Sequence, residues 1–78
     1  KKSFQLVNLD DLEARFEADA TVNGESLAQA GLVKYQDRPI KLLGRGKLEK
    51  ALKITVNKAS KSAVAAVEAA GGSIEVSS

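Results

Sequence analysis

The stretch GRGK at residues 44–47 follows an apolar run and places two glycines beside two cations, which is a composition that can bind phosphate. A Walker phosphate loop would require glycine at Lys41 and serine or threonine at Leu48, whose hydroxyl would hold magnesium. The dinucleotide fingerprint also fails, because Glu49 stands at its third glycine. The spacing therefore argues against nucleotide binding.

The same stretch is better explained as a turn. We expect Gly44 and Gly46 to allow a tight reversal between two strands, because glycine adopts positive φ without steric cost. Such a turn would present cations outward. Residues 40–78 carry seven Lys/Arg against three Asp/Glu, whereas residues 1–39 carry five against seven. This asymmetry is typical of a surface that faces a polyanion, and a solvated cationic face is the alternative.

The acidic cluster of Asp10, Asp11, Glu13 and Glu17 raises the question of carboxylate catalysis or magnesium binding. We expect a solvated helix face, with Asp10 and Asp11 favoured near the helix start by the helix dipole. The chain has neither cysteine nor histidine, which removes thiolate chemistry, histidine bases and most transition-metal sites. We therefore predict no catalytic residue and no metal site. An enzyme that uses carboxylates or lysines stays possible from composition, but a carboxylate-based hydrolase is the least favoured of the candidate functions, and the prediction of no enzyme depends on the family resemblance described below.

A second anion-binding candidate is the start of the helix predicted after residues 57–59. Ser60 is a natural N-cap, and Lys58 and Lys61 flank the free N–H groups, which attract anions. Aromatic residues are few, and Phe4 and Phe16 are predicted to be core. We therefore expect no platform for base stacking, so that any nucleic acid would be bound through its backbone charge and shape.

Hydrophobic periodicity predicts a small mixed α/β single domain over residues 1–78, with helices packed on short strands. Gly71 is expected to close the last helix in the left-handed conformation. No apolar run reaches the roughly 18 residues that cross a bilayer, so no membrane association is expected. The expected strands are residues 3–7, 40–43, 53–56 and 73–76, the helices are 9–17, 25–30 and 60–70, and an extended segment at 32–35 is left open.

Several stretches resemble one ribosomal family. KLLGxGxL at residues 41–48 and ASxxAxxxVxxxG at 59–71 are similar to the signature of bacterial large-subunit ribosomal protein L-fifteen, which is related to archaeal and eukaryotic protein L-eighteen-e. VNLDDL at 7–12 and EAAGG at 68–72 also resemble that family. The likeness covers essentially the whole chain.

The resemblance implies an irregular superhelix of β-β-α turns and a structural constituent of the large ribosomal subunit. It implies binding to large-subunit ribosomal RNA, support of subunit assembly and neighbouring ribosomal proteins as partners. It implies no cofactor, no small-molecule substrate and a location on a cytoplasmic or organelle ribosome. Family members begin with a Gly/Arg/Lys-rich tail, so we expect this chain, which has no methionine, to be the C-terminal globular part without that tail.

The alternative is a protein–protein interaction module that docks a neighbouring protein without direct RNA binding. The glycines and caps Gly44, Gly46, Ser60 and Gly71 are expected to be structural. The residues predicted to face RNA phosphates are Arg45, Lys47, Lys50, Lys53, Lys58 and Lys61.

Overall fold

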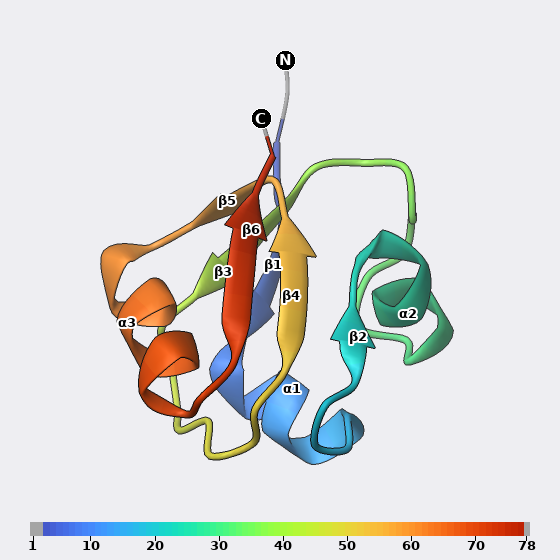
Figure 1. The fold of residues 1–78 in the computed structure, drawn as a ribbon. Helices are drawn as coiled ribbons and strands as arrows, with labels where there is room; N and C mark the ends of the chain where they lie inside the picture. Colours follow the sequence, from blue (N-terminus) through green and yellow to red (C-terminus); the bar gives the residue numbers. More distant parts are fainter. Residues whose placement is uncertain (1–2, 78) are drawn as a thin grey trace.

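The computed structural model describes residues 3–77, which form six strands and three helices (Figure 1). Lys1, Lys2 and Ser78, which belong to the predicted domain 1–78, lie outside the described residues. The predicted α/β class is confirmed. In chain order the elements are β1 (Gln5–Asn8), α1 (Leu9–Arg15), β2 (Thr21–Val22), α2 (Gly24–Gln29), β3 (Ile40–Leu43), β4 (Lys53–Val56), β5 (Lys58–Ala59), α3 (Lys61–Ala69) and β6 (Ser73–Val76).

The chain alternates between two parallel sheets. Sheet A has the strand order β1-β3-β5 and sheet B has the order β2-β4-β6, so each circuit of the chain adds one strand to each sheet. Parallel neighbours require a long crossover, and the helices and the strands of the opposite sheet supply it. In the described residues this winding is the irregular superhelix that the family resemblance implied.

One hydrophobic core lies between the two sheets and is closed by the helices. Strand alternation explains its composition: in β4, Ile54 and Val56 are buried while Lys53 and Thr55 are exposed. Burying a side chain of this size contributes about 1.5–3 kcal/mol. The largest fully buried side chains are Leu9, Leu12, Leu27, Leu42, Leu52, Val7, Val22 and Val67, which come from both sheets, from all three helices and from the segment before β4.

Helix ends follow local chemistry. The Ser60 hydroxyl accepts a hydrogen bond from the Ala63 N–H at 3.2 Å and so caps α3, whose buried face consists of Ala63 and Val67. The Asp11 carboxylate accepts from the Asn8 N–H at 3.1 Å at the start of α1. None of the helices within residues 3–77 is long and apolar enough to cross a membrane.

The structure differs from the sequence-based expectations in several respects. Residues 44–47 do not reverse the chain between paired strands, because β3 and β4 belong to different sheets and a nine-residue connection, 44–52, joins them. The short strands β2 and β5 were not predicted, because two-residue strands carry no alternation. Residues 32–35 form no strand. Phe4 was expected in the core but is 39% exposed, whereas Phe16 packs against the core.

Candidate nucleic-acid interface

The topology brings two basic segments to the same edge of sheet A. Because β3 and β5 are parallel, the connection that follows Leu43 and the helix that follows Ser60 leave from the same side. Gly44 packs on the first turn of α3, where an added Cβ would overlap the Ser62 hydroxyl and lie 2.9 Å from the Ala63 nitrogen. The loop and the helix start therefore adjoin.

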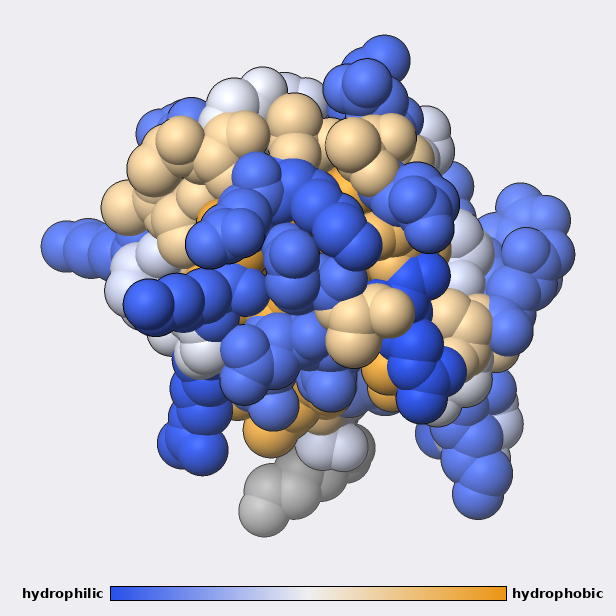
Figure 2. All heavy atoms as spheres, turned by 90° about the horizontal axis from the view of Figure 1, so that it is seen from below, coloured by the Kyte–Doolittle hydropathy of each residue, from blue (hydrophilic) through white to orange (hydrophobic). Residues whose placement is uncertain are grey.

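Three exposed cations lie on this junction: Arg45 and Lys47 in the loop and Lys61 as the first residue of α3. We call these three residues the cationic edge. Figure 2 views the molecule from the end at which the connection 44–52 and α1 lie, and hydrophilic side chains spread over this end with apolar patches between them. The arrangement can bind an extended polyanion along a surface.

Helix α1 holds the loop in place through its acidic face. The Asp10 N–H donates to the Arg45 carbonyl oxygen at 3.2 Å, and the Asp10 Oδ1 accepts from the Lys47 N–H at 3.0 Å. Gly46 has φ of +89°, and a Cβ there would overlap the Asp10 carboxylate. Asp10 therefore fixes the backbone that carries Arg45 and Lys47.

Glu13 and Lys50 form a second set of hydrogen bonds between α1 and the loop, one turn further along the helix. Glu13 Oε1 accepts from the backbone N–H groups of Glu49 at 3.0 Å and Lys50 at 3.3 Å. The Lys50 ammonium donates in return to the carbonyl oxygens of Glu13 at 2.8 Å and Phe16 at 2.9 Å. These carbonyls belong to the last turn and C-cap of α1, where a cation is favoured by the helix dipole.

Most carboxylates of the acidic cluster accept hydrogen bonds from the main chain. Asp10, Asp11 and Glu13 each accept backbone N–H groups, and Glu17 is exposed. Within residues 3–77 no group of three or more carboxylates is arranged to hold a metal ion. Sequence reasoning assigned Asp10 and Asp11 to the helix start; it did not find that Asp10 and Glu13 bind a loop more than thirty residues away.

The six cations predicted to face phosphate do not share one surface. Lys53 points away from the core on the outer face of sheet B, whose neighbouring positions are Thr21 and Ser73. Lys58 lies on the outer face of sheet A, because Ala59 next to it pairs with buried Leu42. Arg45, Lys47 and Lys61 remain together, and Lys50 is bonded to α1.

Lys41 is a cation that the sequence prediction omitted from the site. It pairs in register with Lys58, so the two side chains share the outer face of sheet A. Leu6 of β1 occupies the same row and is 59% exposed. The sequence contained a signal for this position of Lys41. Ile40 and Leu42 stand at alternate positions of the predicted strand and face the core, so Lys41 between them faces outward.

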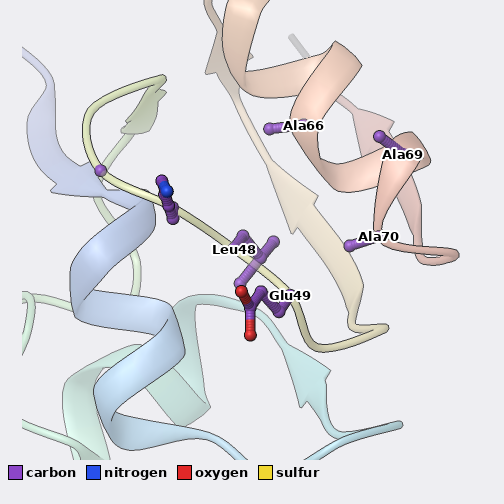
Figure 3. Close-up of a pocket in the computed structure, with 7 residues that line it drawn as sticks. Leu48, Glu49, Ala66, Ala69 and Ala70 are labelled. Atoms are coloured by element: carbon purple, nitrogen blue, oxygen red, sulfur yellow. The ribbon is translucent and has the colours of Figure 1, made fainter.

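A shallow groove of about 520 Å³ separates the loop from α3 (Figure 3). Leu48 and Glu49 line one side, and the methyl groups of Ala66, Ala69 and Ala70 line the other. Lys47 and Glu49 are the ionisable side chains among its lining residues. The other residues that line the groove are glycine, leucine and alanine, so the described lining of the groove contains no further ionisable side chain.

The comparisons with known proteins identify the family. The sequence model described as "Ribosomal proteins 50S-L15, 50S-L18e, 60S-L27A" matches residues 6–75. The chain is 55% identical over 73 residues to large ribosomal subunit protein uL15 of Mycoplasmopsis agalactiae, which covers 94% of this chain and 50% of that protein.

Two further relatives carry the same protein name. The chain is 51% identical to uL15 of Syntrophotalea carbinolica (97% of this chain, 52% of the relative) and 47% identical to uL15 of Myxococcus xanthus (92% and 41%). The chain thus spans about half the length of the curated relatives it matches. The family consists of ribosomal proteins, which confirms the prediction that the chain is not an enzyme. The chain belongs to the L15/L18e/L27A family of large-subunit ribosomal proteins.

Proposed function

We propose that this chain acts as a structural constituent of the large ribosomal subunit, binding its ribosomal RNA through the cationic edge and supporting subunit assembly. Family membership supports the ribosomal role, since the relatives are named large ribosomal subunit proteins. Its place of action is then a ribosome, in the cytoplasm or in an organelle, with neighbouring ribosomal proteins as further partners.

The observation that carries the RNA contact is the anchored loop. Asp10 and Glu13 accept three backbone N–H groups of residues 47–50, so the loop is ordered before any ligand arrives. Binding then costs little backbone entropy, while Arg45 and Lys47 stay exposed. Each phosphate they neutralise releases counterions, which favours binding to a polyanion.

The remaining cations take different parts in this proposal. Lys61 extends the cationic edge to the start of α3, where unpaired N–H groups also favour a phosphate. Lys58 and Lys41 continue the basic surface onto the outer face of sheet A. Lys50 supports the loop rather than contacting RNA, and Lys53 faces away from the edge.

The test is binding of large-subunit ribosomal RNA at several salt concentrations. Replacing Arg45, Lys47 and Lys61 together by glutamine should weaken binding and reduce the slope of log affinity against log salt by about one unit per cation. Lys53→Gln is the matched control, because it removes an exposed lysine from another surface. Circular dichroism should show that both variants keep the fold.

Equal loss of affinity per cation removed, in the triple variant and in Lys53→Gln, would contradict the assignment of the cationic edge. Weak RNA binding with little salt dependence, accompanied by tight binding to another ribosomal protein, would instead favour the protein–protein module.

A further inference from the structure

Gln5 of β1 is hydrogen-bonded to residues 34–38 in the loop between α2 and β3. Gln5 Oε1 accepts from the backbone N–H groups of Lys34 and Tyr35, each at 3.0 Å. Gln5 Nε2 donates to the carbonyl oxygens of Tyr35 at 2.7 Å and Arg38 at 3.3 Å. Four hydrogen bonds from one amide therefore fix residues 34–38.

This loop displays an aromatic ring with a cation on its face. The Arg38 guanidinium lies 4.0 Å from the centre of the Tyr35 ring, and the Lys34 ammonium lies 6.0 Å from it. Tyr35 remains 41% exposed, so the pair is a surface feature and not part of the core. The guanidinium lies over one face of the ring, and guanidinium planes and aromatic rings are both groups on which a further planar group can stack.

We propose that Tyr35 and Arg38 form a stacking site for an unpaired RNA base, with Lys34 and Arg38 supplying charge for the flanking phosphates. The inference rests on the proposed RNA-binding function and adds a second contact of a different kind. It also revises the expectation that the chain offers no stacking platform, which considered Phe4 and Phe16 and left Tyr35 unassigned.

The chemistry favours a base over a phosphate alone. A phosphate binds to cations and does not need an aromatic ring. Phosphate binding alone would therefore give no role to the exposed Tyr35 ring beside the Arg38 guanidinium. Unpaired bases stack on aromatic rings and on guanidinium planes, and such stacking tolerates any base. Because Gln5 already orders the loop, a base meets a preformed surface.

The platform and the cationic edge lie at opposite ends of β3. Pro39 precedes that strand and Gly44 follows it, and in Figure 1 the loop 34–39 crosses the top of the molecule while the connection 44–52 crosses the bottom. One chain can therefore contact a helical RNA segment at one end and an unpaired nucleotide at the other.

Tyr35 is the only tyrosine and the sequence has no tryptophan, so its fluorescence reports this site alone. The probes are a single-stranded adenylate 12-mer, a fully paired RNA duplex and inorganic polyphosphate. We expect the single strand to quench Tyr35 fluorescence saturably and the other two to leave it nearly unchanged. Tyr35→Leu should weaken single-strand binding about tenfold, whereas Tyr35→Phe, followed by anisotropy of labelled RNA, should retain it within about twofold.

Arg38→Lys is the second matched variant, because it keeps the charge and removes the plane; it should weaken the single strand severalfold and leave duplex binding unchanged. Unaltered single-strand affinity in Tyr35→Leu, or equal quenching by polyphosphate, would overturn the stacking site while the salt-dependent duplex binding still stands. No binding of any RNA would overturn both this inference and the proposed function.

Discussion

Gly46 has both a backbone conformation that favours glycine and a close contact with the Asp10 side chain. Its φ of +89° disfavours any L-residue, and an added methyl would displace the Asp10 carboxylate from the Lys47 N–H. We expect Gly46→Ala to lower the free energy of unfolding by about 1–2 kcal/mol for the backbone and about 1 kcal/mol more for the lost hydrogen bond. Urea denaturation would measure the sum of the two costs.

Gly31 provides the control for that prediction. It also has a positive φ, +79°, but an added Cβ would meet no atom within 4 Å. Gly31→Ala should therefore show the backbone cost without the contact cost. If the two variants are equally destabilised, Asp10 does not constrain the loop as the geometry indicates.

Lys50 is a second residue whose contribution to stability can be tested. Its ammonium donates to two carbonyl oxygens at the end of α1 and is half-buried there. Lys50→Met keeps the aliphatic length and leaves those carbonyls without their donor, so we expect a loss of about 1–3 kcal/mol in the free energy of unfolding. Lys47→Met, at an exposed position in the same loop, should change it by less than about 0.5 kcal/mol.

The contrast between these lysines shows where sequence reasoning stops. Both follow the same glycines and both carry one charge, so composition and spacing treat them alike. Their difference depends on the packing of α1 against a loop more than thirty residues later. A Lys50→Met variant as stable as Lys47→Met would refute the structural assignment.

At the scale of elements, the alternation of apolar and polar residues and the helix caps were sufficient to predict several strands and the last helix. The strands at 40–43, 53–56 and 73–76 were predicted with the bounds they have, and α3 differs by one residue at each end. The pairing of β3 with β1 rather than with β4 could not be read locally, because it depends on how the chain returns to sheet A. The residues of the cationic edge are three of the six cations that were predicted to face phosphate, which stays a prediction; their separation from Lys53 follows from that topology.

Asn57 joins the elements where the chain passes from sheet B to sheet A. Its Oδ1 accepts from the Ile40 N–H at 2.9 Å in sheet A, and its Nδ2 donates to the Ser77 carbonyl oxygen at 3.2 Å beyond β6. Asn57→Ala should cost about 1–3 kcal/mol, largely because the partly buried Ile40 N–H loses its acceptor.

Asn57→Asp separates the two bonds, since it keeps the acceptor for Ile40 and loses the donor to Ser77. We expect it to be less destabilising than Asn57→Ala, and hydrogen exchange should show the Ile40 amide protected in the aspartate variant and exposed to exchange in the alanine variant. Similar exchange at Ile40 in both variants would show that the side chain does not join the sheets.

At the scale of the whole molecule, the alternation of strands makes the two sheets interdependent. Sheet A takes β1, β3 and β5 and sheet B takes β2, β4 and β6, so no continuous half of the chain forms either sheet. The buried faces of both sheets meet in one core, and a chain of 78 residues has little stability to spare, about 3–5 kcal/mol for a single core of this size.

We therefore expect the chain to unfold as one cooperative unit. Far-UV circular dichroism reports all the helices and strands, whereas Tyr35 fluorescence reports the loop that Gln5 fixes at the start of sheet A. With a urea dependence near 1 kcal/mol per molar, both signals should change together at roughly 3–5 M. Separate midpoints would mean that the Tyr35 loop opens on its own, and the preformed stacking surface would then lose its physical basis, because the base would have to order the loop on binding.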